Sequence, residues 1–203
     1  MTIPMKQLFS SMMLVAVLVI SCKDKPAKIS DKKTIYNKDF NWTIVIPAGF
    51  DTVSAEKWAA MQNRGTEAIE KTIGEGIENH SKNIFVFSSD QFNYFESVYQ
   101  IFDSSEAGNY DQTFQDVNKV LYGTFEAQMP GTKLDSSSSM ETVSGLEFHK
   151  FKTTIGLPQN KELIFLMYSR MFGNKEFTVN IMTMDRAKEK ELLESWKNSK
   201  FEK

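Results

Sequence analysis

The chain has 203 residues, a formal net charge of −2 and one cysteine, and 41% of its residues are hydrophobic. A net charge so close to zero argues against a nucleic-acid-binding protein, because such proteins present basic patches together with aromatic residues. A single cysteine excludes an internal disulfide. The folded part must therefore be stabilised by its hydrophobic core, for which 16 phenylalanines provide material.

The N-terminal segment has the pattern of a signal peptide. Lys6 supplies a positive charge, and the apolar run over residues 12–20 that follows is too short to span a bilayer comfortably. Met5 is a second candidate start, because MKQLF is the more usual opening of such a segment. The pattern predicts that residues 1–21 form a signal peptide.

The signal segment ends in Val19-Ile20-Ser21-Cys22, which resembles the lipobox of bacterial lipoproteins. The resemblance implies that the Cys22 sulfur receives a diacylglycerol and that cleavage occurs between Ser21 and Cys22. It also implies that a fatty acid such as palmitate acylates the new amine. We therefore expect a bacterial cell-envelope protein held on the membrane by the lipid on Cys22. An ordinary signal peptide with an incidental cysteine, or an N-terminal membrane anchor, is the alternative.

Residues 22–33 are predicted to be a tether between the lipid and the domain. They include five lysines, two aspartates and Pro26, which is typical of a flexible spacer. Contact of the lysines with anionic head groups is the alternative to a purely solvated spacer. Lys23 stands where the inner-membrane retention signal of enteric bacteria has aspartate. We therefore expect the outer membrane, on its periplasmic side or at the cell surface.

The remaining residues, 34–203, are predicted to form a single globular domain. Residues 34–36 and 40–46 are expected as two strands, because apolar side chains alternate along the second. Ser54 is a good N-cap for the helix that follows, and Gly65 interrupts its pattern.

A second pair of strands is expected at residues 84–88 and 95–102. The clearest helix covers residues 109–128. Its apolar stripe consists of Phe114, Val117, Leu121 and Phe125. Residues 132–139 contain four consecutive serines and fit either a strand or a loop, and residues 146–155 form a further strand.

Residues 163–172 and 175–184 make the clearest hairpin, in a register that places Phe172 opposite Lys175. Both faces of this hairpin are apolar, which predicts a central position covered on both sides. A last helix over residues 185–201 provides part of that cover. The element order predicts an α/β fold of the α+β type. We expect a mostly antiparallel central sheet with helices on both faces, an α/β/α sandwich.

The sequence FNWTIVIPAGF of residues 40–50 resembles the start of Mog1/PsbP-like domains, an apolar strand followed by proline and a glycine-aromatic pair. These domains share the element order described above, and the DcrB-like lipoproteins of bacteria belong to the same broad group. The resemblance covers residues 34–201 and implies a Mog1/PsbP-like sandwich. It also implies a binding or assembly factor rather than an enzyme, since family members include a photosystem extrinsic subunit and a Ran-binding protein.

Candidate chemical groups are few and scattered along the sequence. His80 and His149 have no partner at zinc-ligand spacing. A glycosidase pair could be drawn from four glutamates near the end of the first helix, although a charged helix surface is the simpler interpretation. These glutamates are Glu67, Glu70, Glu75 and Glu78. No catalytic, cofactor-binding or metal-binding residue is predicted.

Four methionines near the predicted central hairpin are soft ligands that suit Cu(I). They are Met167, Met171, Met182 and Met184. The expected register places Met182 opposite Phe165, which favours packing in the core over metal binding.

From these features we expect a lipid-anchored, non-enzymatic binding or assembly module for an envelope protein or a small molecule. No cofactor and no nucleic-acid partner are expected. The alternatives are an envelope hydrolase with a carboxylate-based site and a structural or stress-related envelope lipoprotein. A deep pocket with converging polar groups and a buried titratable residue favours the enzyme, whereas an exposed apolar patch favours a protein partner.

Overall fold

The computed structural model describes residues 33–76 and 79–202. The expected signal segment, including Ser21, lies outside the described residues, as do Cys22 and Glu78. The strands are β1 (Lys33–Asn37), β2 (Trp42–Ile46), β3 (Asp51–Thr52), β4 (Lys82–Asp90), β5 (Asn93–Ile101), β6 (Leu134–Val143), β7 (Leu146–Leu157), β8 (Lys161–Phe172), β9 (Lys175–Thr183) and β10 (Lys200–Phe201). The helices are α1 (Ala55–Ile73), α2 (Ser104–Ala107), α3 (Tyr110–Gln128) and α4 (Arg186–Lys197), with a 3-10 turn at Pro158–Asn160.

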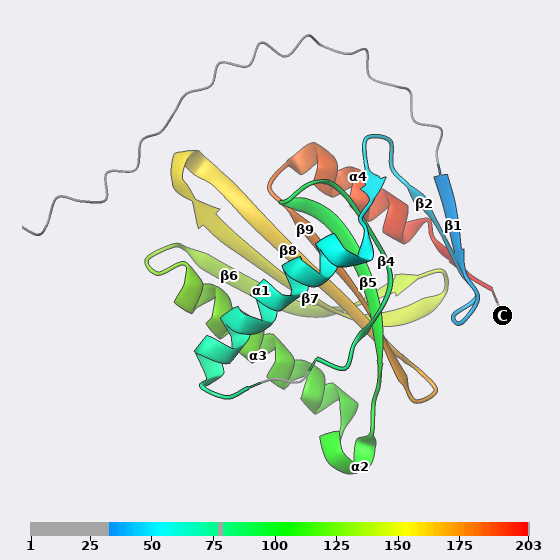
Figure 1. The fold of residues 1–203 in the computed structure, drawn as a ribbon, viewed down its shortest axis with the longest axis horizontal. Coiled ribbons are helices and arrows are strands. Elements are labelled where there is room, and N and C mark those ends of the chain that lie inside the picture. The colour runs from blue at the N-terminus through cyan, green and yellow to red at the C-terminus, as the bar shows by residue number, and fades with distance from the viewer. Residues whose placement is uncertain (1–32, 77–78, 203) are drawn as a thin grey trace, which may run out of the picture.

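A seven-stranded antiparallel sheet forms the centre of the domain, in the order β3-β4-β5-β9-β8-β7-β6 (Figure 1). The β8–β9 hairpin lies in the middle, and Phe172 pairs with Lys175 as predicted. The β6–β7 hairpin turns at Ser144 and Gly145, whose φ angles are 53° and 76°. Two successive positive φ angles are typical of the two-residue turn that matches the strand twist and fixes the register.

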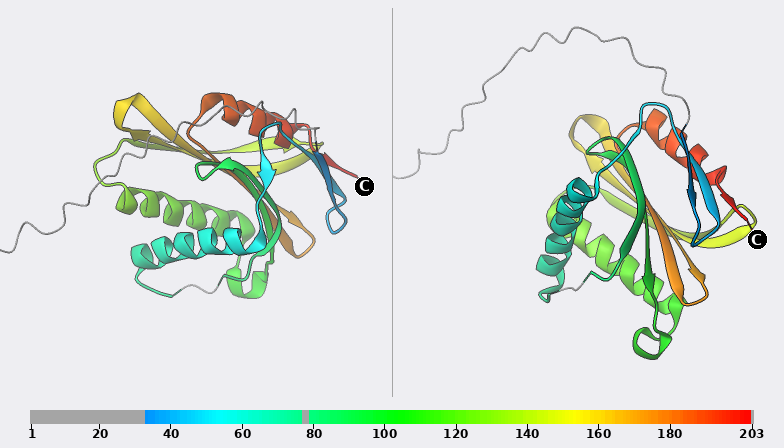
Figure 2. Two further views of the ribbon diagram at one scale, coloured as in Figure 1. Left: turned by 45° about the horizontal axis from the view of Figure 1, so that its top comes forward. Right: turned by 45° about the vertical axis from the view of Figure 1, so that its right-hand side comes forward.

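Helices cover both faces of this sheet (Figure 2). On one face, α1 and α3 pack against each other and α3 contacts β7. On the other face, α4 packs on β5 and β9 beside a three-stranded sheet in the order β1-β2-β10. The predicted fold class, a mostly antiparallel sheet with helices on both faces, is confirmed.

Aromatic rings fill the space between the central sheet, α4 and the small sheet. Trp42 of β2 stacks on Phe85 and Phe201 and meets Phe177 and Trp196 edge to face. Three of these rings, those of Trp42, Phe177 and Trp196, have no exposed surface. Such pairs add about 0.5–1.5 kcal/mol beyond area burial, so this aromatic core is the main stabilising element.

The core on the opposite face is smaller. It consists of Phe114, Phe151, Phe165 and Met167, with Met182 at its margin. Met182 pairs with Phe165, so the predicted packing role of these methionines is confirmed for Met167 and Met182.

The predicted apolar stripe of α3 is wrong at one position. Val117 is 43% exposed, whereas the neighbouring Asn118 is only 6% exposed. The helix contacts both α1 and the sheet. Its buried sector is therefore set by two partners, and it runs through Phe114 and Asn118 rather than Val117.

Three expectations about element boundaries change. Residues 132–139 are largely strand, because β6 pairs with β7 along its whole length. Gly65 does not interrupt α1. The last helix ends at Lys197 rather than at residue 201, because Lys200 and Phe201 form β10 on β2. None of the helices in residues 33–76 and 79–202 is long and apolar enough to cross a bilayer.

Candidate functional site

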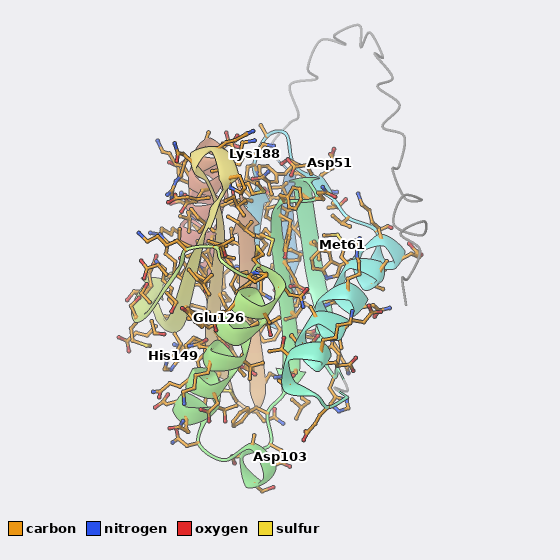
Figure 3. All side chains as sticks on the ribbon, turned by 90° about the vertical axis from the view of Figure 1, so that its left-hand side faces the viewer. Asp51, Met61, Asp103, Glu126, His149 and Lys188 are labelled. Atoms are coloured by element: carbon orange, nitrogen blue, oxygen red, sulfur yellow. The ribbon has the colours of Figure 1, made fainter. Side chains whose placement is uncertain are left out.

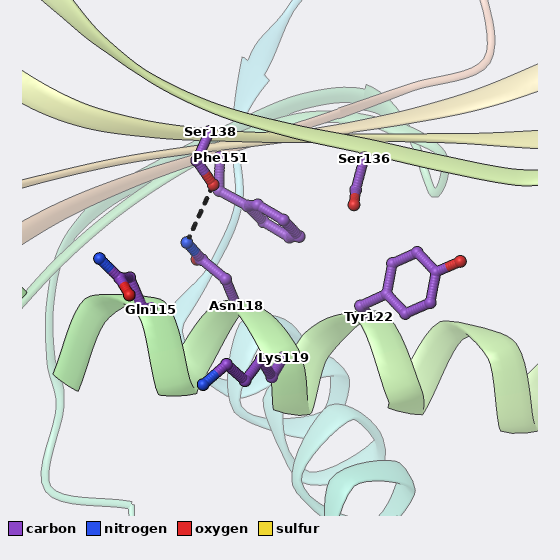
Figure 4. A pocket seen from close by; sticks show the side chains of 7 residues that line it. All are labelled: Gln115, Asn118, Lys119, Tyr122, Ser136, Ser138 and Phe151. Atoms are coloured by element: carbon purple, nitrogen blue, oxygen red, sulfur yellow. Dashed lines mark hydrogen bonds between the residues drawn. The ribbon is translucent and has the colours of Figure 1, made fainter. Parts of the chain in front are cut away.

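A pocket of about 410 Å³ lies between α3 and the β6–β7 end of the central sheet (Figure 4). We call it the α3 pocket. The helix lines it with residues spaced i, i+3, i+4 and i+7, which share one side of a helix. These residues are Gln115, Asn118, Lys119 and Tyr122.

The sheet contributes Ser136 and Ser138 of β6 and Phe151 of β7. Alternate residues of a strand point to the same side. The uninterrupted register places Ser138 opposite Phe151 and Ser136 opposite Thr153. Two of the four consecutive serines therefore face the α3 pocket, and the other two face the opposite side of the sheet.

Asn118 is the buried polar group of the pocket. Its Nδ2 donates a long hydrogen bond of 3.4 Å to Ser138 Oγ, whereas its Oδ1 has no partner. Figure 4 shows the amide projecting from α3 toward Ser138 and Phe151. An unpartnered buried acceptor costs about 1–3 kcal/mol. The arrangement is therefore unfavourable for stability, and a ligand that donates a hydrogen bond can pair with Oδ1 once the amide turns toward the pocket.

Among the described residues that line the α3 pocket, Lys119 alone is charged at neutral pH. Its Nζ lies 2.8 Å from Asp116 Oδ1 on the preceding turn of the helix. The hydrogen bond from Lys119 lowers the pKa of Asp116, so the pair stays ionised and its charges cancel at neutral pH. The pocket is therefore polar without carrying a net charge.

A buried carboxylate, that of Glu96, lies on the face of the central sheet that α1 and α3 cover. Glu96 of β5 accepts hydrogen bonds from Trp58 Nε1 at 2.9 Å, Gln62 Nε2 at 3.0 Å and Asn180 Nδ2 at 2.9 Å. Burial raises the pKa of Glu96 despite these donors. Both carboxylate oxygens have partners, so the cluster holds α1 on β5 and β9.

A second polar network fixes the start of α3. Tyr110 donates to Ser169 Oγ at 2.8 Å, and Ser169 donates to Glu176 at 2.9 Å. His149, which lies beside α3 in Figure 3, is 3.1 Å from Asp111. Ser169 and His149 are paired across β7 and β8, but Ser169 is only 1% exposed and donates to the carboxylate. These hydrogen bonds hold the start of α3 on the sheet and do not form a nucleophile–base pair.

The other residues considered from the sequence lie outside the α3 pocket. His80 is exposed before β4, whereas Glu67, Glu70 and Glu75 line an open hollow of about 390 Å³ at the end of α1. Within the described ranges, no three histidine, cysteine or acidic side chains are placed to hold a metal ion.

A larger hollow of about 520 Å³ separates β2 from α4. Its walls include Val45 and Pro47 on one side and Glu191 and Ser195 on the other, and Ser195 donates to the Val45 carbonyl. None of the described residues that line it has a buried polar side-chain atom without a partner. The open amide of Asn118 therefore makes the α3 pocket the stronger candidate.

Sequence reasoning did not find the α3 pocket. Two signals were present: a polar row at helical spacing that includes Asn118, and a serine run that a strand splits between its two faces. Neither could be interpreted before the structure brought α3 over β6.

No family model matches the chain, and no curated protein matches it. The solution structure of cyanobacterial PsbP (CyanoP) from Synechocystis sp. PCC 6803 is similar over 91% of this chain and 99% of its own, with 12% identity and a TM-score of 0.54. The crystal structure of the Saccharomyces cerevisiae Ran-binding protein Mog1p covers 81% of this chain and 82% of its own, with 10% identity and a TM-score of 0.38. The first likeness shows that the chain has a PsbP-like fold, as predicted.

Proposed function

We propose that the chain is a lipid-anchored protein of the bacterial envelope whose domain binds a partner without catalysing a reaction. The observation that carries the binding role is the unpaired oxygen of the buried Asn118 amide beside the α3 pocket. A group of this kind is stabilised when a bound molecule supplies the missing hydrogen bond.

Two further features support this proposal. The Val19-Ile20-Ser21-Cys22 sequence supports the anchor, because it combines a small residue, a cysteine and a short apolar run. The resemblance of residues 40–50 to Mog1/PsbP-like domains, together with the PsbP-like fold, supports binding or assembly rather than catalysis.

The anchor is tested by growing cells that express the chain with an alkyne analogue of palmitate. We expect the label on the wild-type chain, and mass spectrometry should identify Cys22 as its diacylated first residue. Cys22→Ala should remove the label, whereas Ser21→Ala, which keeps a small residue before the cysteine, should retain it. A mature chain that begins elsewhere and carries no lipid would show that the anchor proposal is wrong.

The binding role is tested by photo-crosslinking at the rim of the α3 pocket. Cys22 is the only cysteine in the sequence and carries the lipid in our proposal, so Gln115→Cys provides a unique free thiol for a benzophenone-maleimide. Gln115 is exposed and lines the pocket. The matched control is Ser137→Cys, on the opposite side of β6. Adducts in native membranes from position 115 and not from position 137 are expected, and equal labelling would contradict a binding role for the pocket.

A further inference from the structure

We propose that the α3 pocket binds a neutral saccharide unit, an inference that rests on the binding role proposed above. Four of the described lining side chains, those of Gln115, Asn118, Ser136 and Ser138, carry amide or hydroxyl groups. The ligand that complements such a surface has many groups that both donate and accept hydrogen bonds, and a sugar ring presents them on every side.

The geometry of the Asn118 amide defines the first contact. The Nδ2 end of the amide is engaged with Ser138, whereas Oδ1 has no partner and almost no accessible surface. A ligand therefore pairs with Oδ1 by displacing the long bond to Ser138 and turning the amide toward the pocket. A sugar hydroxyl can donate to Asn118 Oδ1 and at the same time accept from the hydroxyl of Ser136 or Ser138. The ligand thereby supplies the hydrogen bond that Asn118 Oδ1 lacks in the folded chain.

Aromatic rings supply the apolar part of the site. Figure 4 shows the rings of Tyr122 and Phe151 in the space between α3 and the sheet, flanking the polar groups. Phe151 is almost completely buried, whereas Tyr122 is half-buried. A sugar can therefore pack the C–H face of its ring on Tyr122, while Phe151 forms the apolar floor behind it.

The charge of the pocket argues against an anionic ligand. Recognition of phosphate or carboxylate requires unpaired arginine or lysine groups. Lys119 is the charged residue of the described lining, and Asp116 already neutralises it at 2.8 Å.

The position of Asn118 argues against an extended peptide added to the edge of the sheet. A strand added outside β6 would lie about 4.8 Å beyond it, on the side away from β7. The Asn118 amide instead lies between α3 and the face of the sheet, next to the paired residues Ser138 and Phe151 (Figure 4). A compact ring can reach that position, whereas the backbone of an added strand cannot.

The experiment is saturation-transfer NMR with the lipidated protein in an amine-oxide detergent, which carries no sugar. The probes are glucose, galactose, mannose and N-acetylglucosamine, and a blocked neutral heptapeptide of threonine and valine is the rival ligand. We expect transfer to at least one saccharide. Asn118→Leu and the double variant Ser136→Ala/Ser138→Ala should abolish it.

The matched control is Ser137→Ala/Ser139→Ala, which makes the same chemical change on the other side of the same strand. This control should bind the saccharide like the wild type. Asn118→Leu should also raise the melting temperature by about 2–4 °C, because it removes an unpaired buried group without unfolding the chain.

Three results would overturn the inference. They are equal binding by the two double-serine variants, no transfer to any of the four saccharides, and transfer to the heptapeptide alone. If crosslinking at position 115 still occurs in any of these cases, the binding role stands and only the saccharide assignment fails. If crosslinking also fails, both are wrong.

Discussion

The face of the central sheet under α4 buries mostly aromatic rings, whereas the face under α1 and α3 buries a carboxylate, an amide and several hydroxyls. On the first face, Trp42 and Trp196 are fully buried among other rings. On the second, Glu96 needs three donors and Asn118 keeps one atom unpaired. Unpaired buried atoms occur on both faces, because the indole Nε1 atoms of Trp42 and Trp196 also lack partners. The difference is that ring packing stabilises the first face, whereas hydrogen bonds between polar side chains hold the second.

The largest effect should come from the aromatic face. Trp42→Ala removes a ring that touches the central sheet, α4 and β10, so we expect a loss of about 3–5 kcal/mol in the free energy of unfolding. Urea denaturation measures it. The control Tyr36→Ala, at a ring that is 55% exposed, should change the free energy by less than about 0.5 kcal/mol. A cost below about 1 kcal/mol for Trp42→Ala would contradict the proposed division between the faces.

The buried carboxylate gives the next effect. Glu96→Ala leaves Trp58 and Asn180 without their acceptor and Gln62 with Asn83 alone, and we expect a loss of about 2–3 kcal/mol. Glu96→Gln should cost less than about 1 kcal/mol, because an amide keeps an acceptor for Trp58 and the unpaired Oδ1 of Asn180 can turn to accept from it. Equal losses in the two variants by chemical denaturation would show that the hydrogen bonds are unimportant.

Two carboxylates on opposite faces of the sheet should make contributions to stability that change with pH in opposite directions. Burial raises the pKa of Glu96 above its ordinary value of 4.5. Burial also acts on Glu141, but Lys150 at 2.6 Å and Lys197 at 2.9 Å outweigh it, so the pKa of Glu141 is lowered.

The contribution of Glu96 to stability is therefore complete below pH 4.5 and is lost as the pH rises through its folded-state pKa. The contribution of Glu141 is present above pH 4.5 and is lost as the pH falls through its folded-state pKa. Denaturation of the wild type, Glu96→Gln and Glu141→Gln across this range measures both. If the two variants differ from the wild type in free energy of unfolding by amounts that change with pH in the same direction, the opposite pKa shifts assigned to Glu96 and Glu141 are wrong.

The smallest effect should be a gain in stability rather than a loss. Asn118→Leu should stabilise the chain by about 1 kcal/mol, because it removes an unpaired acceptor and loses only a long hydrogen bond. Gln115→Leu, at an exposed position on the same side of α3, should stay within about 0.5 kcal/mol. If thermal denaturation shows that Asn118→Leu is destabilising, the Asn118 amide stabilises the folded chain and this prediction is wrong.

The parts of the fold that could be predicted depend on short-range patterns. The β8–β9 register follows from its turn and from alternation along neighbouring residues. The serine run of β6 has little strand preference of its own, and its pairing with β7 imposes the strand. The two-residue β10 depends on Trp42 at the other end of the chain, which no local pattern reveals.

The candidate site was less predictable than the fold for a similar reason. Hydropathy along α3 favours burying Val117, but packing between α1 and the sheet buries Asn118 instead. A residue that opposes its local pattern marks a position where function can outweigh stability. Such a position becomes visible only when the packing partners are known.

The pairing of β10 with β2 has a consequence for the time course of folding. Phe201 completes the stack around Trp42, so the small sheet cannot close until the end of the chain is available. Pairing between such distant segments makes folding slow. For a chain exported as we propose, the small sheet would therefore be completed only after the C-terminus has been delivered across the membrane.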